Sequence, residues 1–210
     1  MKSNEQPIKF ILQAIKQAGY QQKDIGLSFD AAASEFFKKG KYVLKKERKK
    51  LTSKQVLKYF SSWIKKYPSI ISLEDPLHED DWTNWQGLTL HLGSAVAIVA
   101  DDLTVTNPER LQKAIDEKAA NAILIKLNQI GTLTETVETC MLAREHGWMT
   151  IVSHRGGGET NDTSMVDLAV AVNAAFIKVG PSRGERVEKY NRLMEIEEEL
   201  KAKPVGKNFR

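Results

Sequence analysis

Apolar residues follow two alternating patterns along the chain. Short continuous runs rich in isoleucine, valine and leucine indicate buried strands, whereas longer stretches with apolar residues every three or four positions indicate amphipathic helices. The expected strands span residues 25–30, 70–74, 96–101, 122–126, 149–154 and 176–178. The expected helices span residues 7–18, 53–66, 134–146, 162–173 and 185–200, with shorter ones around residues 82–85 and after Pro108.

The expected strands alternate with the expected helices. This alternation predicts parallel strand pairing through right-handed crossovers, and hence an α/β fold. A basic stretch, residues 38–54, enlarges the first repeat and predicts a solvated hairpin around Lys39 and Gly40, followed by a helix start. A nucleic-acid or polyanion patch is the less favoured alternative, because the stretch contains few aromatic residues and no known binding motif.

One polar residue stands at the end of every expected strand. These residues are Asp30, Glu74, Asp101, Lys126, His154 and Lys178. In a parallel barrel the carboxyl ends of the strands meet on one face, which is where catalytic groups are carried. We therefore expect the six residues to surround one site.

The charged strand-end residues indicate a metal site with a basic side chain beside it. The carboxylates of Asp30, Glu74 and Asp101 would repel one another if unpaired, and Mg²⁺ would relieve that repulsion while keeping positions for water or substrate. The alternative is a set of surface acids at loop starts. Lys126 and Lys178 end later strands, and a neutral lysine facing a divalent metal suits proton abstraction beside a carboxylate.

Segment 149–163 combines a strand, a polar cluster and a glycine run. Ser153, His154 and Arg155 follow the strand directly, and the glycine run begins at Gly156. Glycine lets the backbone approach a ligand and a helix start offers free N–H groups, so we expect a phosphate-sized anion pocket; an ordinary polar turn is the alternative. The combined site suits a small phosphorylated carboxylic acid that loses a carbon-bound proton.

Composition restricts the class of protein. The 210 residues are 41% hydrophobic and 28% charged with a net charge of +4, which is typical of a soluble globular protein. The sequence shows neither a membrane-spanning apolar run nor a signal peptide, so we expect a cytoplasmic protein without a membrane or nucleic-acid partner. The single cysteine, Cys140, excludes an internal disulfide and is expected to be structural and buried.

The chain resembles the enolase family over nearly its whole length. The matching segments, in family order, are DAAASEFFKKGKY (30–42), SLEDPLHEDDW (72–82), VADDLTVTNPERL (99–111), LIKLNQIGTLTE (124–135), VSHRGGGETNDT (152–163) and RGERVEKYNRLMEIEEEL (183–200). The resemblance implies an enolase-type TIM barrel that uses Mg²⁺ to interconvert 2-phosphoglycerate and phosphoenolpyruvate. It also implies a homodimer for the full-length family.

The resemblance assigns roles to the acidic and basic strand-end residues. Asp30, Glu74 and Asp101 would bind Mg²⁺, and Glu74 and Asp101 would also border the substrate. Lys126 would be the base that removes the C2 proton, giving a metal-stabilised enediolate. Lys178 would contact the substrate carboxylate.

Around the phosphate, the resemblance implies that Ser153, Arg155 and Gly156 border the bound group and that His154 lies in the substrate site. The family usually has a serine and a glycine between its arginine and the Glu-Thr pair. This chain has a glycine run, one residue longer, which removes a hydroxyl. The segment after the last strand, Lys178-Val179-Gly180-Pro181, is one residue shorter than the family pattern.

The match begins at a helix before the third barrel strand of the family. We therefore expect residues 1–210 to form an N-terminally truncated barrel domain of six of the usual eight βα units, without the capping domain. The glutamates that protonate the leaving hydroxyl would be absent with the first third. Two functions stay open: the lyase itself, in the housekeeping enzyme or a divergent paralogue, or a catalytically inactive enolase-like fragment or isoform with a binding or structural role.

Overall fold

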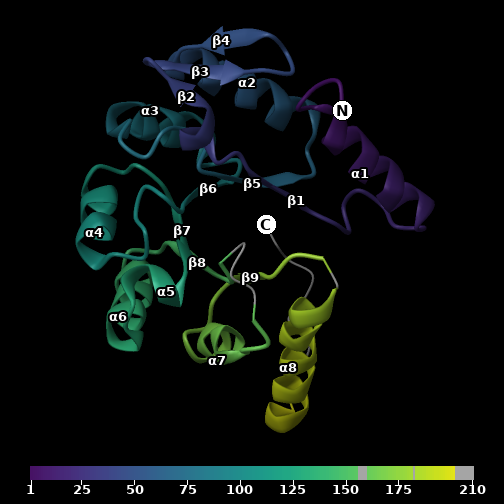
Figure 1. The fold of residues 1–210 in the computed structure, drawn as a ribbon, viewed down its shortest axis with the longest axis vertical. Helices are drawn as coiled ribbons and strands as arrows, with labels where there is room; N and C mark the ends of the chain where they lie inside the picture. The colour runs from purple at the N-terminus through teal and green to yellow at the C-terminus, as the bar shows by residue number, and fades with distance from the viewer. Residues whose placement is uncertain (156–159, 182, 202–210) are drawn as a thin grey trace.

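A computed structural model describes residues 1–155, 160–181 and 183–201 (Figure 1). None of the helices in these residues combines the length and the apolar character needed to cross a membrane. The helical elements are α1 (Gln6–Gln17), η1 (Ala33–Phe36), α2 (Ser53–Lys66), α3 (Trp82–Leu92), α4 (Pro108–Asp116), α5 (Leu127–Ile130), α6 (Leu133–Glu145), α7 (Ser164–Ala171) and α8 (Gly184–Leu200). The strands are β1 (Leu27–Asp30), β2 (Phe37–Lys38), β3 (Lys41–Leu44), β4 (Lys49–Leu51), β5 (Ile70–Glu74), β6 (Ala97–Ala100), β7 (Ala122–Ile125), β8 (Met149–Ser153) and β9 (Phe176–Lys178).

The main sheet is an all-parallel half-barrel. Its strand order is β1-β5-β6-β7-β8-β9, and each neighbouring pair is parallel. Figure 1 shows α3, α4, α6, α7 and α8 on the outside of the arc that the strands form. The sheet curls far enough for Lys178 of β9 to form an ion pair with Asp30 of β1, at the opposite edge. The expected α/β fold, an incomplete barrel of six parallel strands, is confirmed.

The expected hairpin is confirmed and has a third strand. Strands β2, β3 and β4 form a separate antiparallel sheet. Lys39 and Gly40 make the first turn with φ values of +51° and +75°. Positive φ at both central residues gives a turn whose twist matches that of the flanking strands.

Three element boundaries differ from the sequence expectation by two residues. Strand β1 begins at Leu27 instead of Ile25, and helix α7 spans Ser164–Ala171 instead of residues 162–173. Asp162 lies in the turn before the helix, where its carboxylate accepts hydrogen bonds from the Ser164 N–H (3.2 Å) and hydroxyl (2.6 Å). An aspartate that binds the backbone two residues on favours a turn over a first helical position.

The core fills the layer between the sheet and the helices. Trp85 of α3 is fully buried in the larger cluster, together with Leu73 of β5 and Ile98 of β6. Cys140 of α6 is buried in the second cluster, as expected for a structural cysteine. A small separate cluster that includes Val99 and Leu124 comes from alternate residues of the strands, because neighbouring side chains on a strand point to opposite faces.

Replacing Thr52 by alanine should lower the free energy of unfolding by about 1 kcal/mol. Thr52 caps α2 reciprocally: its hydroxyl accepts the Gln55 N–H (3.4 Å), and the Gln55 side chain accepts the Thr52 N–H (2.9 Å). Denaturant unfolding measures the loss. Ser62→Ala, at an exposed position in the same helix, is the control and should change stability little, since alanine favours a helix. Equal stability of the two variants would contradict the capping role.

Candidate functional site

Three strand-end residues form one ion-paired group. The Lys178 ammonium lies 2.9 Å from Asp30 Oδ2 and 2.6 Å from Glu74 Oε1. Lys178 ends β9, whereas Asp30 and Glu74 end the neighbouring strands β1 and β5. The Glu74 side chain is only 4% exposed. The curl of the sheet therefore places one lysine from its last strand against two carboxylates from its first two.

A second ion pair joins the two middle strands. Asp101 follows β6 and Lys126 follows β7, and their side chains meet with Nζ 2.5 Å from Oδ2. Both side chains are largely buried. Strands β5 and β6 are paired, and Asp75, the residue after Glu74, accepts a hydrogen bond from the Asp101 N–H at 2.9 Å, so the two ion-paired groups are adjacent. Five of the six strand-end residues thus converge at one edge of the sheet.

The pKa of Glu74 is raised to about 7. Burial of the carboxyl is the main cause and repulsion by Asp30 the next, with Lys178 acting in the opposite direction. Burial also opposes the charged form of Lys178, but its contacts with Glu74 and Asp30 raise the pKa of this lysine above its ordinary value. The site therefore holds a carboxyl that can take a proton near neutral pH beside a firmly charged lysine.

Among the described residues, one group of carboxylates has the spacing of a metal site. Oxygens of Asp75, Asp101 and Asp102 lie within 4.8 Å of one another. However, the two Asp75 oxygens accept hydrogen bonds from the backbone N–H groups of Asp101 and Asp102, at 2.9 Å each. Asp75 is therefore engaged in holding the loop after β6. The expected set of Asp30, Glu74 and Asp101 is not gathered to that spacing. Instead, Asp30 and Glu74 are ion-paired with Lys178, and Asp101 is ion-paired with Lys126.

The expected anion segment is described only in part. Ser153 is buried, and its hydroxyl donates to the His154 carbonyl at 2.6 Å, with the Lys178 carbonyl 3.3 Å away. His154 is half-buried and Arg155 is exposed. Gly156 lies outside the described residues. At the far end of this segment, the Lys189 ammonium of α8 donates to the Thr160 carbonyl.

Three residues of the site have no counterpart among the sequence-predicted ones. Asp75 directly follows Glu74 and binds the loop that carries Asp101. Thr106 and Gln129 form hydrogen bonds that connect the segments carrying Asp101 and Lys126. Asp75 could have been identified from the sequence, because it is an acidic residue directly after the end of a strand. No periodic signal marks Thr106 or Gln129, since both act through side-chain contacts across the fold.

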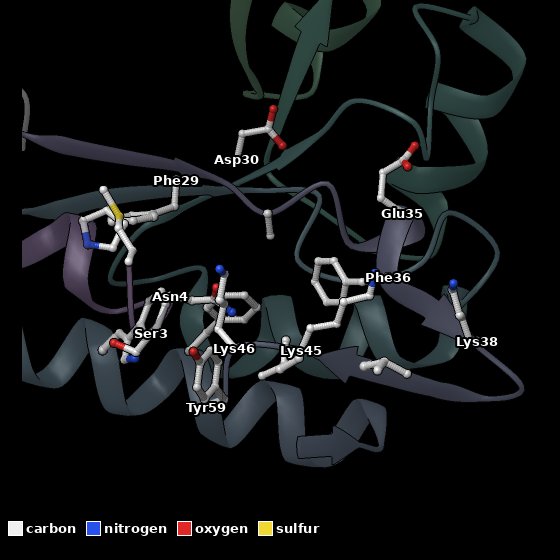
Figure 2. Close-up of a pocket in the computed structure, with 17 residues that line it drawn as sticks. Ser3, Asn4, Phe29, Asp30, Glu35, Phe36, Lys38, Lys45, Lys46 and Tyr59 are labelled. Carbon is white, nitrogen blue, oxygen red and sulfur yellow. The ribbon is translucent and has the colours of Figure 1, made fainter. Parts of the chain in front are cut away.

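Two cavities flank β1. One, of about 800 Å³, is lined by Asp30, Glu74 and Lys178 together with apolar strand residues. The other, of about 670 Å³, lies beside α2 and the hairpin, and is lined largely by aromatic residues and lysines. Figure 2 shows its lysines Lys45 and Lys46 opposite Asp30 and Glu35. Only the first cavity contains several strand-end residues, so it is the candidate active site.

Comparison with known proteins identifies the family of the chain. The family model described as "Enolase, C-terminal TIM barrel domain" matches residues 1–210. The protein named "Enolase" from Elusimicrobium minutum (strain Pei191) is 54% identical over 198 residues, covering 94% of this chain and 45% of the relative. The chain thus spans less than half the length of that curated relative.

Proposed function

Since the chain belongs to the enolase family, whose C-terminal TIM barrel domain matches residues 1–210, we propose that its site dehydrates 2-phosphoglycerate to phosphoenolpyruvate with Mg²⁺. The observation that carries the proposal is the convergence of Asp30, Glu74 and Asp101 with Lys126 and Lys178 at the carboxyl edge of the sheet. These groups supply hard oxygen ligands and amines at one end of the sheet, and Asp30, Glu74 and Lys178 also line the larger cavity. That set suits removal of a proton next to a carboxylate.

In this proposal Asp30, Glu74 and Asp101 hold the metal ion. A bound Mg²⁺ would stabilise the negative charge that develops on the substrate carboxylate as the proton leaves. Glu74 and Asp101 are also proposed to border the substrate, and both are buried. Burial excludes water, so charges within the site interact more strongly than they would in solution.

Lys126 is the proposed base for the C2 proton. Its ammonium contacts Asp101, so the base and a metal ligand face the same point. Lys178 is proposed to contact the substrate carboxylate, for which its firmly held positive charge is suited. His154 and the segment of Ser153, Arg155 and Gly156 are proposed to bind the rest of the substrate, including its phosphate.

The cellular location, pathway, oligomeric state and partners of the full-length protein are also proposed from the family match. We expect a cytoplasmic glycolytic lyase that works as a homodimer when full-length, with residues 1–210 forming a single barrel domain. Neither a membrane nor a nucleic acid is an expected partner. These expectations follow from the family match and from the pocket chemistry.

The test is formation of phosphoenolpyruvate from 2-phosphoglycerate by the purified chain, followed by ultraviolet absorbance. Activity that depends on Mg²⁺ and disappears with a chelator would support the lyase for this chain. Circular dichroism should confirm that the sample is folded. A folded chain that binds Mg²⁺ but forms no product would favour the alternative, a catalytically inactive enolase-like protein with a binding or structural role.

Mg²⁺ binding should strengthen as the pH rises through about 7. The pKa of Glu74 is raised to about 7, so this carboxyl is mostly protonated below that pH, and the proton competes with the cation. Metal affinity should fall by up to about tenfold for each pH unit below 7. Isothermal titration calorimetry across this range measures the effect.

Glu74→Gln is the matched variant for the pH dependence. It keeps the shape of the side chain but has no titrating proton, so its weaker Mg²⁺ binding should vary little around neutral pH. A wild-type affinity that is flat between about pH 6 and about pH 8 would contradict the assignment of Glu74 as a ligand with a raised pKa.

A further inference from the structure

Four residues at the candidate site form a closed ring of hydrogen bonds. The Lys126 backbone N–H donates to the Thr106 hydroxyl at 2.9 Å, and that hydroxyl donates to Gln129 Oε1 at 2.8 Å. Gln129 Nε2 donates to Asp101 Oδ1 at 3.1 Å. The Lys126 ammonium closes the ring by donating to Asp101 Oδ2 at 2.5 Å.

The direction of every bond in the ring is fixed. A backbone N–H can only donate, so the Thr106 hydroxyl accepts from Lys126 and must direct its own hydrogen to Gln129. The Gln129 carbonyl oxygen accepts that hydrogen, which turns the amide nitrogen towards Asp101. An ionised carboxylate can only accept, so both Asp101 oxygens are satisfied by donors in the ring. The two functional side chains, Lys126 and Asp101, therefore have their orientations set together.

The backbone at Thr106 is held in an unfavourable conformation. Val105 and Thr106 have φ values of +46° and +57°, in the left-handed region that β-branched residues rarely adopt. Such conformations are strained and persist only where surrounding contacts fix them. Thr106 is fully buried, and its carbonyl accepts a hydrogen bond from the Thr139 hydroxyl of α6 at 3.0 Å. In this conformation the Thr106 hydroxyl lies within hydrogen-bonding distance of Gln129 and the Lys126 N–H.

We propose that Thr106 and Gln129 are positioning residues that hold the Lys126 amine and the Asp101 carboxylate in a fixed relative orientation. The inference rests on the proposed function, in which Asp101 binds Mg²⁺ and Lys126 is the base. Neither Thr106 nor Gln129 touches the substrate in this scheme. Their effect passes through the two residues that they orient, as partners of metal ligands do in other metal sites.

The principal test is Mg²⁺ binding by calorimetry to the full chain and to Thr106→Val, which keeps the shape of the side chain but removes the hydroxyl. Affinity should fall by on the order of tenfold, the low end for loss of a group that orients a metal ligand. Thr106→Ser restores the hydroxyl and should bind nearly as tightly as the unsubstituted chain. Gln129→Met breaks the ring at another point and should lower affinity to a similar extent.

The double variant Thr106→Val with Gln129→Met sharpens the test. Because the ring acts as one unit, the double variant should bind Mg²⁺ no more weakly than the weaker single variant. Fully additive losses would indicate two independent packing effects and would overturn the inference.

Thr104→Val is the matched control. Thr104 is equally buried in the same loop, but its hydroxyl binds only backbone carbonyls, at 3.2 Å from Ala100 and 3.5 Å from Asp101. Its loss should lower thermal stability as much as Thr106→Val does, while leaving Mg²⁺ affinity unchanged. An equal fall in affinity for both threonine variants would overturn the positioning role.

Two negative results can be told apart. If the unsubstituted chain binds Mg²⁺ and the ring variants bind it with the same affinity, only the positioning role fails. If the unsubstituted chain does not bind Mg²⁺, the proposed function fails as well, since the ring would then orient no metal ligand.

Discussion

Replacing Lys126 by alanine should abolish hydrogen exchange at C2 of 2-phosphoglycerate. A positioned general base contributes about 10²–10⁴-fold to the rate of proton transfer, and the largest loss is expected where no other amine can reach the carbon. Lys178, the other lysine of the site, is engaged by Asp30 and Glu74. Exchange can be followed by nuclear magnetic resonance in deuterated water with Mg²⁺ present. This readout does not require the leaving hydroxyl to be protonated, so it tests the base separately from the complete reaction.

The control for this experiment is Lys113→Ala. Lys113 lies on the surface of α4, and its contacts there are a long ion pair with Glu117 and the ring of Trp82. Its removal should leave exchange unchanged. Exchange that persists in a folded Lys126→Ala variant would contradict the assignment of Lys126 as the base.

Replacing Lys178 by methionine should destabilise the metal-free chain by about 2 kcal/mol. Removing one partner of a buried ion pair costs about 3–5 kcal/mol, and this value is reduced here because the Lys178 side chain is 37% exposed. The variant leaves the buried Glu74 and the neighbouring Asp30 without their shared cation. Denaturant unfolding in the presence of a chelator measures the loss.

Mg²⁺ should restore much of this stability. A cation held by Asp30 and Glu74 replaces the missing positive charge, and a ligand that binds only the folded state stabilises it by mass action. The gain on adding Mg²⁺ should therefore be larger in Lys178→Met than in the unsubstituted chain. A gain of equal size in both would indicate that the cation does not bind where Lys178 contacts the carboxylates.

Arg192→Met provides the comparison for an ion pair whose acidic partners are exposed. Arg192 of α8 contacts Asp167, Glu195 and Glu199 on the surface. Ion pairs with solvent-exposed partners are screened by water and contribute little, so a small loss of stability without dependence on Mg²⁺ is expected.

Much of the half-barrel could be predicted from local sequence patterns. Buried strands such as 122–126 are continuous apolar runs, and helices such as 53–66 repeat their apolar residues at helical spacing, so both appear within a short window of sequence. The boundaries were less certain. Aspartate is common at the start of a helix, but Asp162 lies in a turn. Its carboxylate accepts hydrogen bonds from the Ser164 N–H and hydroxyl, and the helix begins only at Ser164.

The sequence predicted which residue types form the candidate site, but it did not predict which of these residues form ion pairs with one another. Polar residues at strand ends indicated Asp30, Glu74, Asp101, Lys126 and Lys178, because parallel strands bring their carboxyl ends together. The roles assigned to these residues, and to Ser153, His154 and Arg155, stay predictions. Gly156 lies outside the described residues, so the expected effect of the glycine run on the phosphate pocket also stays a prediction.

The sequence by itself determined the order of strands and helices and the chemical groups available at the carboxyl edge, since both depend on interactions between residues close together in the chain. The tertiary structure decided which of these groups meet. Lys178 reaches Asp30 only because the sheet curls until its two edge strands approach each other at this end. Likewise, the ring through Thr106 and Gln129 closes only when the loops after β6 and β7 are packed side by side, and a hydrogen bond between distant segments leaves no periodic signal in the sequence.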